Sequence, residues 1–163
     1  MPCSPTAGKS RGLTRVAIAL GSNLGDREGY LRAALAALGT SVHHLRVSTF
    51  HETAPVGVGP QPTFLNAVAV GDTALTPREL LDTLLDVERE LGRERPYPGA
   101  ARTLDLDLIL YDEAIMDAPE LTVPHPRFRE RRFVLEPLAE LAPDWRDPVT
   151  GRTVEELLRG LVS

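Results

Sequence analysis

The sequence of 163 residues contains one cysteine, Cys3, so the chain cannot form an intramolecular disulfide. It has no Cys-x-x-Cys pair and no cysteine and histidine spacing typical of structural zinc sites. No apolar run approaches the roughly 18 residues of a membrane-spanning helix, and the first residues lack the apolar core of a signal peptide. These absences exclude disulfide-stapled and zinc-stapled folds, and we expect a cytoplasmic protein without a membrane partner.

An excess of basic charge is also lacking, because the formal net charge is −5 at pH 7. Proteins that bind nucleic acids usually present a basic surface, so we expect no nucleic-acid partner. The arginines nevertheless cluster within this acidic chain, and guanidinium groups bind small anions such as phosphates well. The two clusters are Arg93, Arg95 and Arg102, and Arg127, Arg129, Arg131 and Arg132.

The residues that are present are typical of a globular protein, with 42% hydrophobic and 25% charged residues. A chain of this length most simply forms a single domain. We expect residues 1–13 to form a flexible leader and residues 14–163 to form the folded domain.

Hydrophobic periodicity and capping residues predict the order of the secondary-structure elements. The predicted order is β, α, β, β, α, β with a C-terminal extension, which is that of a ferredoxin-like α+β fold. Such a fold has an antiparallel sheet with helices packed on one face. The predicted strands cover 15–20, 45–53, 64–72, 104–110 and 120–123, and the predicted helices end near Gly39, Gly92 and Leu161, the last two being capped at Thr76 and Thr153.

The predicted strand over 104–110 carries two aspartates in an otherwise apolar segment. Alternate side chains of a strand share a face, so Asp105 and Asp107 should project together with Ile109, with bases roughly 7 Å apart. Carboxylate oxygens suit Mg²⁺, and two carboxylates with phosphate oxygens can bridge a pair of ions. The alternative is a half-solvated strand with two surface acids. The opposite face is expected to carry Leu104, Leu106, Leu108 and Leu110.

Three further polar residues each leave two interpretations open. Glu88 lies on or beside the apolar stripe of the second helix, where it either pairs with an arginine or accepts a hydrogen bond from a ligand. His125 is either structural or a phosphate ligand. Asn66 interrupts an apolar strand, so its amide must find partners in the backbone or in a heterocyclic ligand.

The segments GSNLGD, RTLDLD and LTVPH occur in this order, and the combination is highly specific. Together with their surroundings they resemble the 6-hydroxymethyl-7,8-dihydropterin pyrophosphokinases of folate biosynthesis. The resemblance extends from Val16 to about Leu158. The matching segments are ALGSNLGD, TAPVG before QPTFLNAV, ERELGR, ARTLDLDLILY, LTVPHPRF and RRFVLEPLAEL.

The resemblance implies an enzyme that moves the β,γ-diphosphate of ATP to the hydroxymethyl group of the pterin and releases AMP. It implies that Asp105 and Asp107 hold two Mg²⁺ ions, and that Arg93 and Arg102 act with them as catalytic residues. The residues that it implies for nucleotide binding are Glu88, Arg95, Leu108, Thr122, His125 and Arg131.

The resemblance also implies a pterin pocket and two small substrates, and we expect the chain to be a monomer. Asn66 would pair with the edge of the heterocycle, assisted by Thr53 and the backbone of Val56. Phe64 and Phe133 would supply aromatic faces for a flat ring.

Three departures from the family pattern bear on nucleotide affinity and leave the metal carboxylates untouched. The loop before Arg102 lacks the usual aromatic residue, for which Tyr97 is a candidate replacement. Pro126 stands where the family commonly has a tyrosine, and Glu120 where it frequently has an arginine.

Two other functions compete with this interpretation. A nucleotidyltransferase also pairs an early Gly-Ser with an Asp-x-Asp strand, but usually with one short helix between them, whereas about eighty residues intervene here. A non-catalytic ferredoxin-like ligand-binding module would need neither the two aspartates nor the arginines around them.

Overall fold

The computed structural model of the chain describes residues 12–23, 25–53, 63–91 and 104–161. Residues 1–11 of the predicted leader lie outside these ranges, so the leader stays a prediction. The strands are β1 (Thr14–Ser22), β2 (His43–Val47), β3 (His51–Thr53), β4 (Phe64–Thr73), β5 (Asp105–Tyr111), β6 (Met116–Ala118) and β7 (Leu121–Val123). The helices are α2 (Arg27–Leu38), α3 (Pro77–Leu91), α4 (Arg132–Leu141) and α5 (Val154–Arg159), with a 3₁₀ turn at Phe128–Glu130.

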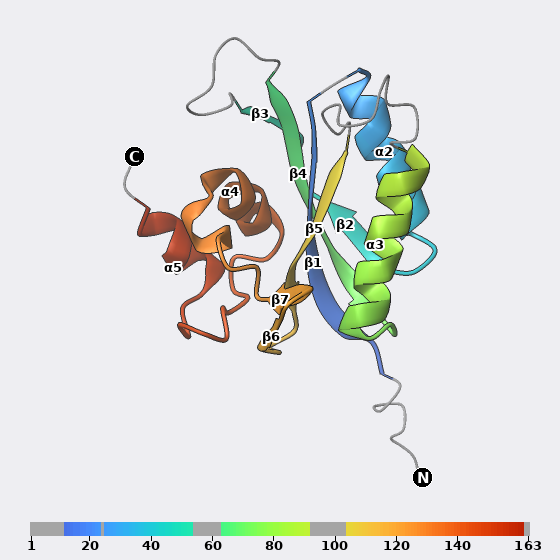
Figure 1. Cartoon of the computed structure of the whole chain (residues 1–163). Coiled ribbons are helices and arrows are strands. Elements are labelled where there is room, and N and C mark those ends of the chain that lie inside the picture. The colour runs from blue at the N-terminus through green and yellow to red at the C-terminus, as the bar shows by residue number, and fades with distance from the viewer. Residues whose placement is uncertain (1–11, 24, 54–62, 92–103, 162–163) are drawn as a thin grey trace.

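An antiparallel sheet forms the centre of the fold, with strand order β2-β4-β1-β5 and with β3 paired to the first part of β4. Helices α2 and α3 cover one face, and α4 and α5 lie on the other (Figure 1). The predicted α+β fold, an antiparallel sheet with helices packed on it, is therefore confirmed. The two helices of the ferredoxin-like order share a face, while the C-terminal extension adds the second helical layer.

The alternation of side chains along β1 explains why both faces of the sheet are covered. Val16, Ile18 and Leu20 are buried on the side of α2 and α3. Ala17 is buried on the side of α4 and α5, and Ala19 packs against the same cluster. Removing apolar surface on both faces from water supplies the main favourable term for this arrangement.

The predicted helix caps are present. At the start of α3, the Thr76 hydroxyl accepts a hydrogen bond from Glu79 N at 3.1 Å, and the Glu79 carboxylate accepts one from Thr76 N at 2.9 Å. A second capping box joins Thr153 and Glu156 at the start of α5. Each box satisfies N–H groups that have no partner within the helix. The predicted end of α3 at Gly92 lies outside the described residues.

The side chains of β5 depart from the predicted alternation at one leucine. Leu108 packs toward α2 and α3 as predicted, but Leu110 packs together with Ile109 on the side of α4 and α5. On the neighbouring strand, Ala17 pairs with Leu110 while the next residue, Ile18, pairs with Leu108. Ile109 is therefore the extra residue of a β-bulge. The residues after it have their side chains on the face opposite to the one that regular alternation predicts. The prediction for Leu110 is wrong for this reason.

The predicted strand over 45–53 is divided into β2 and β3. Between them, the Ser48 hydroxyl accepts the N–H of Val68 at 3.0 Å, so a side chain replaces a backbone partner of the ladder. Serine side chains compete with regular structure in this way, and a strand pattern does not reveal it. The predicted strand near 120–123 is confirmed as β7, which forms a hairpin with β6, a strand that was not predicted.

A buried ion pair joins the 3₁₀ turn to the C-terminal segment. Asp147 is fully buried, and Arg129 donates to both of its oxygens, with 2.9 Å between Arg129 Nη2 and Asp147 Oδ1. The Thr150 hydroxyl and the Val149 N–H donate to the same carboxylate at 2.8 and 3.0 Å. Burial raises the pKa of Asp147, but the hydrogen bonds from Arg129, Thr150 and Val149 outweigh burial and hold the pKa below its usual value.

We expect Asp147→Asn to lower the free energy of unfolding by about 2–3 kcal/mol near neutral pH, because Arg129 loses its counter-ion in a mostly buried site. The contribution of Asp147 should be fully present above about pH 4, the unfolded-state pKa, and should be lost as the pH falls through the lower folded-state pKa. Urea unfolding at pH 7 and pH 3 measures the loss of stability in the variant and its dependence on pH. The exposed Asp144→Asn is the control, and an equal loss for Asp147→Asn at both pH values would contradict this expectation.

Candidate functional site

A pocket of about 320 Å³ opens between the sheet and the start of α4. Its size is in the range of small-molecule sites. Strands β1, β3, β4 and β5 supply the floor and one wall, and the beginning of α4 supplies the opposite wall. The pocket is lined by Ala19, Leu20, Gly21, Thr53, Phe64, Asn66, Ala67, Asp105, Asp107, Ile109, Arg131, Phe133 and Val134.

Most of the site residues predicted from the sequence and described by the structure line this pocket. The pocket contains Thr53, Phe64, Asn66, Asp105, Asp107, Arg131 and Phe133. The predicted residues that do not line it are Glu88, Leu108, Thr122 and His125. Val56, Arg93, Arg95 and Arg102 lie outside the described residues, as does Tyr97, and their roles stay predictions.

The register of the sheet places three pocket residues in one row. Gly21 on β1 pairs with Asn66 on β4 and with Asp105 on β5. Two residues back along β1, Ala19 pairs with Asp107. A Cβ atom added to Gly21 would lie 3.0 Å from the side-chain oxygen of Asn66. The floor between the amide and the carboxylates is therefore open because residue 21 has no side chain.

Asn66 is held in one orientation by the neighbouring strand. The side chain is buried, with 7% of its surface exposed, and its Nδ2 donates to the Thr53 hydroxyl at 2.6 Å. The buried amide thus has the partner that burial requires. An amide fixed in this way can present a donor and an acceptor side by side to the edge of a planar ring.

Asp105 and Asp107 both face the pocket from β5, and each is half-buried. No group of three or more His, Cys, Asp or Glu side chains in the described ranges could hold a metal ion. Two carboxylates nevertheless suit Mg²⁺, which commonly takes one or two from the protein and completes its shell with water and substrate phosphates. The pair therefore fits a metal that binds together with a nucleotide.

The wall opposite the strands presents a cation and an aromatic ring. Arg131 precedes α4 directly, and its guanidinium carbon lies 5.5 Å from the centre of the Phe133 ring. Phe133 is 38% exposed, so part of this ring borders the pocket and remains accessible to a ligand. An accessible aromatic face of this kind can stack on a flat heterocycle.

Glu88 reaches the strand of the two aspartates from the other face of the sheet. Its Oε2 on α3 accepts the backbone N–H of Leu106 at 2.7 Å. Leu106 lies between Asp105 and Asp107. Because β5 is an edge strand of the sheet that the structure describes, its outward-facing N–H groups have no neighbouring strand there to accept them. The carboxylate therefore fixes the edge strand between the two aspartates. The sequence did not predict this backbone contact.

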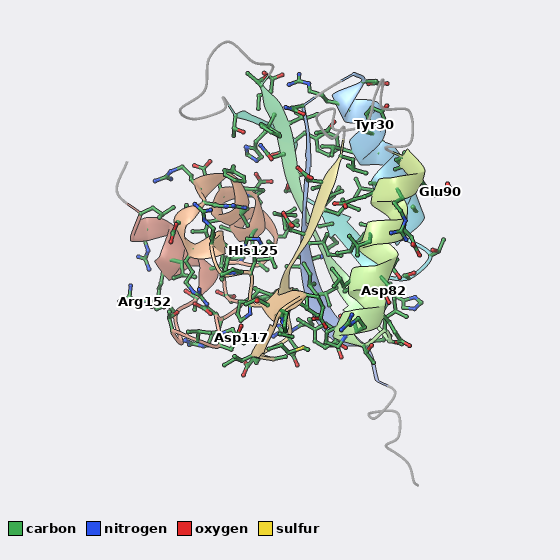
Figure 2. All side chains as sticks on the ribbon, in the orientation of Figure 1. Tyr30, Asp82, Glu90, Asp117, His125 and Arg152 are labelled. Atoms are coloured by element: carbon green, nitrogen blue, oxygen red, sulfur yellow. The ribbon has the colours of Figure 1, made fainter. Side chains whose placement is uncertain are left out.

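His125 follows β7 and is attached to β5 through the backbone, because its N–H donates to Ile109 O at 2.9 Å. Figure 2 shows it on the side of β5 where α4 lies. Burial lowers the pKa of His125, Asp107 raises it, and Arg131 and Arg127 lower it, with a net lowering. The ring is therefore neutral near pH 7. Its Nδ1 accepts the Arg127 N–H at 3.2 Å, which leaves Nε2 as the donor.

Leu108 and Thr122 do not line the pocket. Leu108 is buried toward α2 and α3, and Thr122 is half-buried on β7, opposite Asp117. Glu120, which departs from the family pattern, forms an ion pair with Arg78 of α3. The structure thus gives this departure a partner within the chain.

Six lining residues were not predicted as site residues, namely Ala19, Leu20, Gly21, Ala67, Ile109 and Val134. Ala19 and Gly21 lie on the side of β1 opposite its large apolar residues, so the alternation along the strand was an available signal. Val134 is part of α4, a helix that was not predicted, and it lies in the segment RRFVLEPLAEL.

The sequence profile of the family described as 7,8-dihydro-6-hydroxymethylpterin-pyrophosphokinase (HPPK) matches residues 17–143. The chain belongs to this family. A 2-amino-4-hydroxy-6-hydroxymethyldihydropteridine pyrophosphokinase from Pseudomonas aeruginosa is 45% identical over 148 residues, which are 90% of this chain and 91% of the relative. A protein with the same name from Bacillus subtilis is 48% identical over 126 residues, which are 76% of this chain and 75% of the relative. The family predicted from the motifs is confirmed.

The fold also matches a solved member of the HPPK family. The crystal structure of Plasmodium falciparum HPPK-DHPS superimposes on 90% of this chain with a TM-score of 0.72. At 12% identity this likeness shows the fold alone. The matched region is 44% of the Plasmodium chain, so this chain spans less than half of it.

We expect Glu88→Ala to speed amide hydrogen exchange at Leu106, because the N–H at the sheet edge loses its charged acceptor. The free energy of unfolding should fall by about 1–2 kcal/mol. Glu88→Gln keeps an oxygen acceptor at the same reach and serves as the matched control, with an intermediate exchange rate. Unchanged Leu106 exchange in Glu88→Ala would show that the contact does not hold the strand.

Proposed function

We propose that the chain transfers the diphosphate group of ATP to the hydroxymethyl group of 6-hydroxymethyl-7,8-dihydropterin and releases AMP, as a step of folate biosynthesis. The ATP-dependent pyrophosphokinase activity follows from membership of the HPPK family and from relatives at 45% and 48% identity. The supporting observation within the chain is the row of Asn66, Gly21 and Asp105 across the pocket floor. It sets a hydrogen-bonding amide beside a carboxylate with no side chain between them.

In this proposal the pterin ring occupies the pocket above Gly21. Asn66, oriented by Thr53, recognises the donor and acceptor edge of the ring. Phe64 and Phe133 supply apolar faces, since both line the pocket. Val56 is proposed to add a backbone contact.

Asp105 and Asp107 are proposed to hold two Mg²⁺ ions. When bound, such ions offset charge on the transferred diphosphate and polarise the oxygens around them. The chain contributes by positioning, because Glu88 holds Leu106, the residue between the two carboxylates, at the edge of the sheet. Fixed carboxylates fit a reaction in which alignment and electrostatics supply most of the acceleration.

The nucleotide is proposed to lie on the β5 and β7 side of the two aspartates. The neutral His125 ring can donate from Nε2 to a phosphate oxygen, and Arg131 offers a cation at the pocket wall. Arg93 and Arg102 are proposed as further catalytic cations. The remaining proposed nucleotide contacts are Glu88, Arg95, Leu108 through its backbone, and Thr122.

The location and partners of the chain stay predictions from the sequence. We propose a monomer in the cytoplasm that acts on two small substrates, without a nucleic-acid or membrane partner. Among the helices that the structure describes, none is both long and apolar enough to cross a membrane.

Incubation of the protein with ATP, Mg²⁺ and the reduced hydroxymethylpterin should produce AMP and pterin diphosphate in equal amounts. Separation of the nucleotides by chromatography gives the ratio, and a reaction without pterin is the control. ADP would indicate transfer of a single phosphoryl group, and free pyrophosphate would indicate nucleotidyl transfer. Either product in place of AMP and pterin diphosphate would reject the proposal.

Asp107→Asn should lower kcat by about a hundredfold to a thousandfold or more, because it removes charge where the diphosphate is transferred. The fold should persist, as circular dichroism would show, since Asp107 faces the pocket. Asp82→Asn, which removes an exposed charge from α3, is the matched control and should leave kcat unchanged. Near-normal turnover in Asp107→Asn would exclude the metal role.

A further inference from the structure

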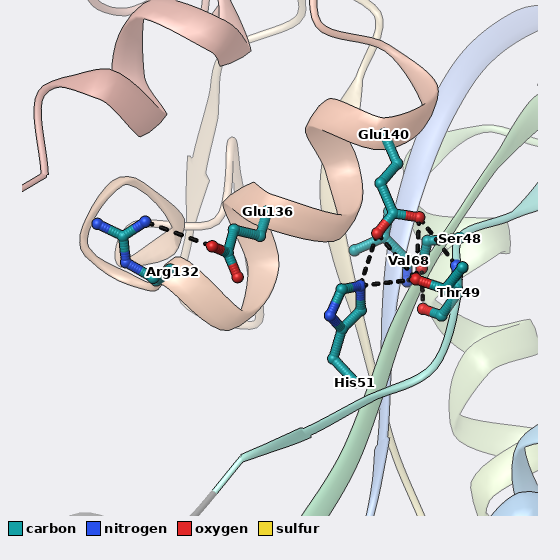
Figure 3. Close-up of polar contacts among 7 residues, drawn as sticks. All are labelled: Ser48, Thr49, His51, Val68, Arg132, Glu136 and Glu140. Carbon is teal, nitrogen blue, oxygen red and sulfur yellow. Dashed lines mark hydrogen bonds and ion pairs between the residues drawn. The ribbon is translucent and has the colours of Figure 1, made fainter.

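A cluster of three polar residues lies on the α4 side of the sheet, outside the pocket lining. The Glu140 carboxylate on α4 accepts the Thr49 N–H at 2.9 Å, and the Thr49 hydroxyl lies 2.9 Å from Glu140 Oε2. His51 Nε2 lies 2.6 Å from the same Oε2 (Figure 3). We call Thr49, His51 and Glu140 the clasp, because they join residues about ninety positions apart in the sequence.

The clasp is composed like a catalytic triad but is not arranged as one. A relay needs the histidine to bind the hydroxyl through one nitrogen and the carboxylate through the other. Here Thr49 Oγ1 and Glu140 Oε2 both contact the same nitrogen, His51 Nε2, at 2.9 and 2.6 Å. The ring therefore cannot pass a proton between them, and the cluster serves attachment.

The carboxylate of the clasp is charged near neutral pH. Burial raises the pKa of Glu140, but the Thr49 N–H, the His51 ring and the Thr49 hydroxyl outweigh burial and hold the pKa below its usual value. The side chains of His51 and Glu140 are 31% and 34% exposed. Hydrogen bonds to an ionised carboxylate are stronger than those between neutral groups.

The clasp connects the two walls of the pocket. His51 pairs with Asn66, and Thr53 lies two residues further on the same face of β3. On the other wall, Phe133 stands at the beginning of α4, while Glu140 stands near its end. Strand β3 has three residues, and within the described parts of the chain its ladder is formed with β4, so the ladder holds it weakly without further contacts.

We infer that His51 and Glu140 are positioning residues that set the distance between the Thr53 and Asn66 wall and the Phe133 wall of the pocket. The inference rests on the proposed function, because it takes this pocket as the pterin site. The two aspartates lie on β5, which β1 and Glu88 hold independently of the clasp. Loss of the clasp releases the three-residue strand β3 more readily than the ten-residue helix α4, which Arg131 precedes, so it weakens pterin binding before it affects the nucleotide.

The test compares two variants of the same helix. Glu140→Ala removes the clasp, whereas Glu136→Ala removes an exposed partner of Arg132 one turn earlier (Figure 3). In Glu140→Ala the KM for pterin should rise about tenfold, with the KM for ATP within about twofold of the wild type. Glu136→Ala should leave both KM values unchanged.

A second pair of variants guards against loss of folding in Glu140→Ala. His51→Ala should raise the KM for pterin, and His51→Gln, which keeps an N–H donor of similar reach, should restore most of it. Equal changes in both KM values, or no change in either, would overturn the inference. So would a failure of His51→Gln to restore binding.

A measurement without turnover separates this inference from the proposed function. The side-chain amide signals of Asn66, read by nuclear magnetic resonance, should shift in Glu140→Ala because its partner Thr53 moves with β3, and should stay in place in Glu136→Ala. If the wild-type protein forms no AMP, the proposed function fails while the amide signals still report on the clasp. Unshifted Asn66 signals in Glu140→Ala would overturn the inference by themselves.

Discussion

Strand β1 pairs with β4 on one side and β5 on the other, and the site depends on this double register. The pairing brings Asn66 and Asp105 to either side of Gly21, although they come from segments about forty residues apart. A shift of one residue in either ladder would turn one of these side chains to the opposite face of the sheet. Apolar burial on both faces of β1 opposes such a shift, so the packing of the core also fixes the spacing of the polar groups.

The two helical layers act on different parts of the site. From one face, α3 holds the segment between the two aspartates through Glu88. From the other face, α4 presents Phe133 to the pocket and is joined to β3 through Glu140. Strand β5, which carries the two aspartates, and the wall that carries Phe133 are thus supported from opposite faces of one sheet. The pocket lies between them.

Local signals in the sequence were sufficient for much of the fold. Thr76 and Glu79 predicted the start of α3, and the aspartates of β5 share the predicted face because strand periodicity is a local property. Leu110 could not be placed in the same way, since the bulge appears only when β5 is paired with β1. The contact of Glu88 with Leu106 N likewise requires the packing of α3 on the sheet edge. For the site, the motif resemblance supplied residues that periodicity alone left open.

The bulge at Ile109 divides β5 into two parts whose side chains face the two sides of the sheet in different patterns. Before it, β5 alternates between carboxylates that face the pocket and leucines that face α2 and α3. From it onward, two successive apolar residues face the C-terminal helices. The bulge thus separates the part of the strand that is free to carry charge from the part that must seal the second core. Deletion of Ile109 would leave Ala17 paired with Leu110 and Ile18 paired with Leu108 in a regular ladder, whereas deletion of a residue between Asp105 and Leu108 would turn one side of the strand to the opposite face of the sheet.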